Sequence, residues 1–352
     1  MSAQPTLPAA DLVTLARDLL AAAGAPGDKA LLVAEALVDA DIEGLGSHGL
    51  MLLPMYLDRI AAGSVVPSAE GRIVSDTGTQ IVFDAENGLG HVTAARAAAL
   101  AVERAAEHGL AAVAVRNVFH FGAAGRFART MAEAGCVGMV MANTRPLMPA
   151  PGGAERVVGN NPIAMAVPGP AGPIVLDLAL SAGAMGKIRL AESRGATIEP
   201  GWATDAAGTP TTDPGEAIRG MLLPAGGPKG FGLAVMVDLM TGGLASGAIG
   251  EAVSPLYGDL AKPYGSANLF LAIDIAGFRP LADFTAAAGM FADRIRASRT
   301  APGAGPVRMP GDRASEAHRS FVGGCSLAPA TRAALVAAAE RLGVVVPPSL
   351  IA

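Results

Sequence analysis

The sequence predicts an α/β (α+β) protein, in which a helical domain built from both ends of the chain flanks a central sheet domain. Apolar residues recur at helical spacing through the first 62 residues and again after residue 281. Between these stretches, short apolar runs typical of buried strands alternate with helical segments. We therefore expect the helical domain over residues 1–72 and 285–352, and the sheet domain over residues 73–284.

The first elements follow from this periodicity. Residues 11–23 and 28–40 are predicted as helices, the second with Asp28 near its start. A third helix, 50–62, follows the turn Ser47-His48-Gly49. The period then changes, and residues 71–84 predict two short strands around the turn Asp76-Thr77-Gly78.

The remaining elements are read in the same way. Helices are expected over 93–108, 123–134, 185–194, 229–246, 281–297 and 328–342. Strands are expected over 111–116, 137–143, 163–167, 174–177 and 268–275. Residues 200–224 are rich in turn formers, and a Gly/Pro-rich link covers 302–312.

Composition excludes several functional classes. The 352-residue chain has a net charge of −5, which argues against a nucleic-acid binder because a basic face is missing. No apolar run approaches the ~20 residues that span a bilayer, and residues 1–8 do not resemble a signal peptide, so we expect a cytoplasmic protein with no membrane partner. Cys136 and Cys325 give neither a disulfide framework nor zinc-ligand spacing, and no metal site is expected.

The segment Gly44-Leu45-Gly46-Ser47-His48-Gly49 matches the dinucleotide-binding pattern G-x-G-x-x-G. That pattern requires a strand before it and a helix after it. The preceding segment has a helical period, and no acidic residue ends a second strand about 20 residues on. We therefore do not expect a Rossmann site at this motif.

Two of the five histidines lie in glycine-flanked turns. His48 can act as a general acid oriented by Ser47, because an imidazole exchanges protons near neutral pH. It can equally be an exposed residue in a capping turn whose N-cap is Ser47. His120 lies at a strand–loop–helix junction, where ligands commonly bind, but it can also simply bond a loop carbonyl.

Four further polar residues, taken singly, each have a structural interpretation, and Lys229 also has a functional one. Lys229, after Gly227-Pro228, can hold a phosphate or carboxylate, or be a solvated residue in the first helical turn. Asp177 ends an apolar strand, where a carboxylate often caps a loop. Asn160 and Asn161 in Gly159-Asn160-Asn161-Pro162 can be ordinary turn residues.

Taken in order, the motifs resemble the malate/L-lactate dehydrogenase family, whose NAD(P)-binding fold is not of the Rossmann type. The matching segments cover nearly the whole chain: 46–50, 120–125, 142–144, 159–164, 175–179, 186–189, 210–214, 227–233 and 308–311. That family includes ureidoglycolate dehydrogenase, 2,3-diketogulonate reductase, sulfolactate dehydrogenase and piperideine-2-carboxylate reductase. The resemblance implies hydride exchange between NAD or NADP and a small 2-oxo acid, 2-hydroxy acid or imine.

The resemblance also implies roles for individual residues. His48 is expected to donate the proton with Ser47 as its partner, and His120 to lie beside the nicotinamide; some members assign proton transfer to the latter histidine. The expected cofactor contacts are His120, Phe121, Gly122, Ala123, Ala124, Thr144, Asp177, Leu178, Ala179, Lys229, Met309, Pro310, Gly311, Asp312 and Arg313. The expected substrate contacts are Leu52, Arg145, Asn160, Met185 and Gly186. The resemblance also implies a homodimer or a higher assembly.

The chain departs from the family pattern at four positions. Many members have an arginine four residues after the catalytic histidine, where this chain has Leu52. Arg145 stands where many relatives have a small residue, and we expect it to supply the missing guanidinium unless the substrate is unusual. Asn160 replaces a more usual threonine at a substrate-facing position. Lys187 stands where the cyclic-imine reductase has an aspartate, which favours carbonyl or alcohol chemistry. An NADPH-dependent imine reductase and a non-catalytic ligand-binding homologue remain the alternatives; a metal hydrolase is less favoured, since paired ligand spacing is missing.

Overall fold

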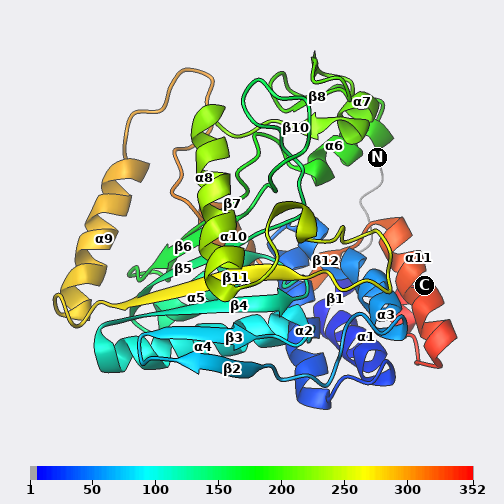
Figure 1. The fold of residues 1–352 in the computed structure, drawn as a ribbon, viewed down its shortest axis with the longest axis horizontal. Helices are drawn as coiled ribbons and strands as arrows, with labels where there is room; N and C mark the ends of the chain where they lie inside the picture. Colours follow the sequence, from blue (N-terminus) through cyan, green and yellow to red (C-terminus); the bar gives the residue numbers. More distant parts are fainter. Residues whose placement is uncertain (1–5, 352) are drawn as a thin grey trace.

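The computed structural model describes residues 6–351 and has a seven-stranded sheet at its centre (Figure 1). In sheet order the strands are β2 (Arg72–Asp76), β3 (Gln80–Asp84), β4 (Leu110–Val118), β11 (Ser266–Asp274), β5 (Cys136–Ala142), β6 (Ile163–Val167) and β7 (Ile174–Leu178). Only β3 and β4 run parallel; every other neighbouring pair is antiparallel. The sheet is therefore mixed, unlike the parallel sheet of a Rossmann domain.

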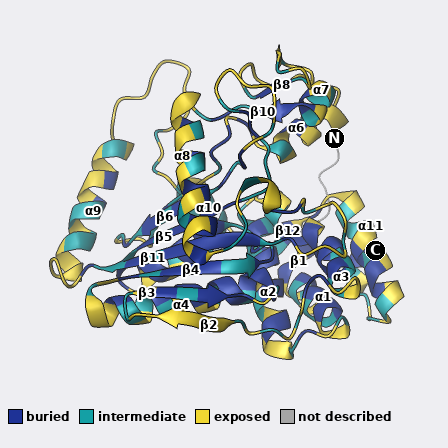
Figure 2. Cartoon of the chain, viewed as in Figure 1, coloured by how far each residue is buried: buried dark blue, intermediate teal, exposed yellow. Residues whose placement is uncertain are grey.

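Helices cover both faces of this sheet. Alternate residues of β4 point to opposite sides, so Val113 packs with helices α4 (Gly90–His108) and α5 (Ala124–Glu133), whereas Ala114 packs with α8 (Pro228–Asp238). Alanine lines the sheet-facing side of α4, which lets the helix approach the strands closely. Figure 2 shows the resulting buried centre beneath exposed outer helix faces.

Helices from the two ends of the chain share a separate core. It is formed by α1 (Ala9–Ala22), α2 (Gly27–Ile42), α3 (Leu53–Ala61) and α11 (Pro329–Leu342), while β1 (Thr6–Pro8) pairs with β12 (Gly324–Ser326). Helix α9 (Leu281–Arg296) lies at the opposite end of the molecule (Figure 1). The division into two domains and its boundaries stay predictions.

A small lobe is formed by the part of the chain between β7 and α8. It contains α6 (Met185–Ser193), α7 (Pro214–Arg219) and the short strands β8 (Ala203–Thr204), β9 (Pro210–Thr211) and β10 (Met221–Leu222) (Figure 1). The sequence indicated only turns over 200–224, because two-residue strands are too short to display a period of two.

The other differences from the sequence-based elements are local. The helix predicted over 50–62 begins at residue 53, and two 3₁₀ turns, Gly46–His48 and Leu50–Leu52, precede it. The helix predicted over 229–246 starts as α8 and continues as a π-helical turn, Leu239–Gly243. Helices α10 (Asp312–Arg319) and α12 (Pro348–Ile351), like β1 and β12, were not predicted. Residues 6–351 contain no helix that is both long and apolar enough to cross a membrane.

Arg59 joins α3 to the loop that precedes β11. Its side chain is fully buried, and its guanidinium donates to the carbonyl oxygens of Pro255, Leu256 and Lys262 at 2.9–3.1 Å. One fully buried guanidinium thus bonds three carbonyls of this loop and holds the loop against the helix.

We expect Arg59→Met to lower the free energy of unfolding by about 3 kcal/mol, because the carbonyls of Pro255, Leu256 and Lys262 lose their donor and the hydrogen bonds of a fully buried charged group are removed. Urea unfolding followed by circular dichroism measures this. Arg17→Met, at an exposed arginine of α1, is the control and should change stability by less than about 0.5 kcal/mol. Equal stability of the two variants would contradict the assignment.

Candidate active site

The Ser47-His48 turn is tied to the end of α2 by Asp41. The backbone N–H of Leu50 donates to Asp41 Oδ2 at 2.8 Å. Gly49 lies so close to this carboxylate that a Cβ at that position would stand 2.3 Å from Asp41 Oδ1. The turn therefore needs glycine at residue 49, and the direction in which His48 leaves the backbone is fixed. Burial raises the pKa of Asp41 to about 6, against the opposing effect of the Leu50 hydrogen bond.

His120 lies on the link between β4 and α5. The backbone at Phe119 and His120 is held against the start of α4, where a Cβ at Gly90 would lie 2.3 Å from both of their carbonyl oxygens. After the histidine, Gly122 takes a positive φ of 79° beside the buried ring of His91. These close approaches fix the backbone on both sides of His120.

The structure brings His48 and His120 together. Their rings are stacked, with centroids 5.8 Å apart and an interplanar angle of 23°. A hydrogen bond of 3.0 Å joins Ser47 Oγ to His48 Nδ1, and one of 2.7 Å joins Tyr56 Oη to His120 Nδ1. In both rings the hydroxyl partner occupies Nδ1, so Nε2 is the nitrogen left for a ligand.

Burial lowers the pKa of His48 below its ordinary value. It lowers the pKa of His120 further, and His48 and His91 add to this effect because a second positive charge beside them is unfavourable. His91 has its pKa lowered to about 3, chiefly by burial and then by Arg126 and His48. All three imidazoles are therefore neutral at neutral pH.

Tyr56 and His91 were missed from the sequence. Tyr56 is fully buried on α3, and its ring packs edge-on against Phe119 at 4.9 Å. Two signals were available in the sequence: Tyr56 lies about eight residues after His48, and the chain has only three tyrosines. Nothing in the sequence indicated that His91 would lie behind the His120 loop.

The Gly159-Asn160-Asn161-Pro162 motif reaches the end of β5. Asn161 is buried: its Oδ1 accepts from the backbone N–H of Thr144 at 2.9 Å, and its Nδ2 donates to Ala234 O at 2.8 Å. Thr144 Oγ1 donates to Asn160 Oδ1 at 2.9 Å. Asn161 thus positions the segment, while Asn160 and Thr144, predicted as substrate and cofactor contacts, lie together.

Arg145 follows directly and is half-buried. Its side chain makes no hydrogen bond or ion pair with any residue that the structure describes. Burial, and then Arg156, lowers the pKa of Arg145, whereas Tyr264 raises it. The Tyr264 ring contacts Phe119, the neighbour of His120, with centroids 6.4 Å apart. Arg145, which has no counter-ion among the described residues, is thus linked to the His120 loop through Tyr264.

The other predicted substrate residues differ in their placement. Gly186, beside Met185 at the start of α6, lies against Ser47, since a Cβ at residue 186 would stand 3.5 Å from Ser47 Cβ. Leu52 is 2 % exposed within the core of the end helices, so it offers a ligand neither charge nor surface. The ammonium of Lys187 lies over the Trp202 ring, 5.9 Å from its centroid.

Several predicted cofactor residues meet where β7 ends. Asp177 Oδ2 accepts from the backbone N–H of Gly125 at 2.7 Å, which joins the 177–179 segment to the start of α5. Gly311, with φ of 82°, packs against the backbone of Val175. Asp312 accepts from the backbone N–H of Met309 at 2.8 Å and pairs with Arg296.

This junction brings together three of the segments predicted to contact the cofactor, 120–124, 177–179 and 309–313. Asp177 Oδ1 is left to accept from a hydroxyl such as that of a ribose, because only Oδ2 bonds Gly125. Burial raises the pKa of Asp177 to about 6 although the residue keeps contact with solvent at the strand end. Lys229, by contrast, is exposed at the start of α8 and makes no hydrogen bond or ion pair with the described residues.

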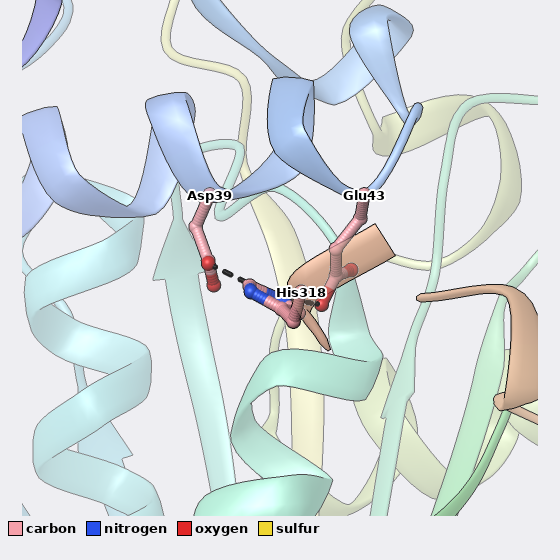
Figure 3. A group of neighbouring side chains, drawn as sticks. All are labelled: Asp39, Glu43 and His318. Carbon is pink, nitrogen blue, oxygen red and sulfur yellow. Dashed lines mark hydrogen bonds and ion pairs between the residues drawn. The ribbon is translucent and has the colours of Figure 1, made fainter. Parts of the chain in front are cut away.

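Asp39, Glu43 and His318 form a second polar cluster, in which α10 meets α2 (Figure 3). Their ligand atoms lie within 4.8 Å of one another, as in a metal site. However, Asp39 pairs with Arg126 at 2.6 Å and Glu43 with Arg129 at 2.5 Å, so the carboxylates are already balanced by cations of α5. The cluster therefore serves as a polar contact that joins α10, α2 and α5.

Comparison with known proteins gives consistent relatives. A family model described as malate/L-lactate dehydrogenase matches residues 7–335. The (2R)-3-sulfolactate dehydrogenase (NADP(+)) of Chromohalobacter salexigens is 42 % identical, covering 75 % of this chain and 80 % of the relative. The ureidoglycolate dehydrogenase (NAD(+)) of Escherichia coli is 35 % identical, covering 84 % and 85 %. The solved sulfolactate dehydrogenase of Methanocaldococcus jannaschii superposes with a TM-score of 0.92 at 31 % identity, covering 97 % and 98 %.

The raised pKa of Asp41 predicts how the stability of the protein depends on pH. Because its folded pKa of about 6 lies above the ordinary 3.8, the wild type loses stability as pH rises from about 4 through 6. Each tenfold change in proton affinity is worth about 1.4 kcal/mol, so the loss is at most about 3 kcal/mol.

Asp41→Asn keeps an oxygen for the Leu50 N–H and removes the charge. The free energy of unfolding of this variant, relative to that of the wild type, should therefore increase as pH rises from about 4 to about 7.5. Urea unfolding at several pH values measures this difference. Asp28→Asn, at an exposed aspartate of the same helix, is the control. If the difference in free energy of unfolding between the wild type and Asp41→Asn does not change with pH, the interpretation is contradicted.

Proposed function

The chain belongs to the malate/L-lactate dehydrogenase family, and we propose that it oxidises a small 2-hydroxy acid to the 2-oxo acid, and reverses this reaction, with His48 exchanging the proton. Membership makes it a dehydrogenase that uses NAD or NADP and acts on a CH–OH group. The stacked pair of His48 and His120, each with Nδ1 engaged and Nε2 left for a ligand, is the observation that carries the proposal.

A bound nicotinamide cofactor supplies the hydride acceptor for the oxidation. His48 Nε2 would take the hydroxyl proton and keep it on the imidazole, while the bound nicotinamide would accept the hydride from the carbinol carbon. The neutral state that burial favours for His48 suits this base role. In the reverse direction the same ring, once protonated, returns the proton to the forming alkoxide.

Arg145 is proposed to bind the substrate carboxylate. The guanidinium stays charged in spite of its lowered pKa, and it lacks a protein counter-ion among the described residues. A carboxylate ligand would complete the pairing. Leu52 cannot serve this purpose because it is apolar and buried.

The position of Lys187 favours alcohol and carbonyl chemistry over imine reduction. Its ammonium lies over the Trp202 ring in the small lobe. The position therefore provides no carboxylate to pair with the catalytic histidine, in contrast to the aspartate of the cyclic-imine reductase. The imine reductase alternative is tested directly by including pyruvate with an amine among the substrates.

We also propose a homodimer. Helices α8 and α9 are exposed along much of their outer faces (Figure 2). The exposed residues there include the apolar Leu233, Met236, Met290 and Phe291, which are 51–70 % exposed. Burial of such side chains against a second copy would be favourable. The oligomeric state stays a prediction.

The central test follows NAD(P)H absorbance with malate, lactate and 3-sulfolactate, and with pyruvate plus methylamine. We expect turnover of a 2-hydroxy acid, and a loss of about 10²–10⁴ in kcat for His48→Gln. Nicotinamide fluorescence should show that the variant still binds cofactor. His108→Gln, at a half-exposed histidine at the end of α4, is the matched control and should retain wild-type turnover. Full activity of His48→Gln would refute the role of His48, and turnover of the imine alone would support the alternative.

Arg145→Met should raise KM for the 2-hydroxy acid more than tenfold, because a charge-assisted hydrogen bond is worth about 1.5–3 kcal/mol. The KM for cofactor should change little. Arg194→Met, at an exposed arginine beyond α6, controls for loss of positive charge. If KM for the acid is the same in the wild type and Arg145→Met, then another group binds the carboxylate.

A further inference from the structure

The two histidines of the site have hydroxyl partners in different environments. Tyr56 is fully buried between α3 and the β4 exit, whereas Ser47 is exposed on its turn. The Tyr56–His120 hydrogen bond, at 2.7 Å, is also shorter than the Ser47–His48 bond of 3.0 Å. The partner of His120 is therefore fixed, and that of His48 is free to rotate.

The direction of the Tyr56 hydrogen bond follows from its surroundings. Among residues 6–351, His120 Nδ1 is the only hydrogen-bond partner of the phenol, and burial keeps the proton on oxygen by raising the pKa of Tyr56. A buried hydroxyl with one neighbour of this kind donates to it, because otherwise its own proton would have no acceptor. His120 Nδ1 is then an acceptor, and its ring proton is on Nε2.

A second proton on His120 is disfavoured by everything packed around the ring. His48 is stacked on it, His91 lies beyond Gly122, and the Tyr56 side chain covers Nδ1. Gaining a proton at Nδ1 would also require the Tyr56 hydroxyl to turn away, without another acceptor in reach. The ring is thus kept in one protonation state.

The exposed Ser47 hydroxyl places no such restriction on His48. A serine hydroxyl can donate to an imidazole nitrogen or accept from it, and solvent can take up the other half of its hydrogen bonding. His48 can therefore present Nε2 either with or without a proton.

We propose that Tyr56 is a positioning residue that holds His120 as a neutral imidazole donating from Nε2, so that proton exchange is left to His48 alone. His120 then offers a fixed N–H to a carbonyl oxygen of the bound ligand. This assignment rests on the proposed function for the role of His48, but the state of His120 is a property of the protein by itself.

The state of His120 is tested by nuclear magnetic resonance of ¹⁵N-histidine-labelled protein without ligand, with the signals assigned by His120→Gln. We expect Nδ1 of His120 to have the shift of an unprotonated nitrogen and Nε2 that of a protonated one, unchanged from pH 6 to 8. In Tyr56→Phe, which keeps the ring against Phe119, the His120 signals should move toward a mixture of tautomers or begin to titrate. Ser75→Ala, at an exposed hydroxyl of β2, should leave them unchanged.

Kinetics supply the second readout. The pH profile of kcat/KM should show one ionisation on its acidic side in the wild type and a second in Tyr56→Phe, with a fall of about tenfold in kcat/KM at neutral pH, since one hydrogen bond is lost. Ser75→Ala should retain the wild-type profile, and thermal unfolding of both variants checks that they fold.

The outcomes separate this proposal from the function. A proton on His120 Nδ1 in the wild type, or His120 signals that are identical in Tyr56→Phe, overturns the role of Tyr56 even if His48 is essential for turnover. Full activity of His48→Gln overturns the proposed function, whereas the resonance result still decides the state of His120.

Discussion

The hydrogen bond between Tyr56 and His120 joins the two parts on which the site depends. Tyr56 belongs to the core of the end helices, and His120 follows a strand of the central sheet. His48, also attached to the helical core, stacks on His120 only because these parts are held in register. The paired imidazoles thus depend on contacts between helices and sheet that no single segment of the chain supplies.

The charge of the site depends on which of its charged side chains have an oppositely charged partner. Burial favours neutral histidines, and Asp39 and Glu43 are matched by the arginines of α5. Arg145 has no such partner among the described residues, so its half-buried guanidinium is a positive charge left without a protein counter-ion there. An anionic group would be favoured beside it.

Much of the fold could be predicted from the sequence because long periodic segments determine it. Every helix and strand expected between residues 93 and 194 is present. The strands β8, β9 and β10 were not predictable because two residues are too short to display a period, and the pairing of β1 with β12 was not predictable because the partners are distant in sequence. The same limit applied to the site: glycine-flanked motifs indicated Ser47, His48 and His120, whereas Tyr56 gained its role only from its neighbour in the folded chain.

The close backbone contacts at Gly49 and Gly90 affect how variation in this chain should be interpreted. A methyl group at either position would collide with the carboxylate of Asp41 or with the carbonyls beside His120. A saturation scan of the gene would thus score these glycines as intolerant as the histidines that they support. Intolerance alone does not distinguish a residue that performs chemistry from one whose lack of a side chain leaves room for it, and only substitutions that preserve the backbone separate the two.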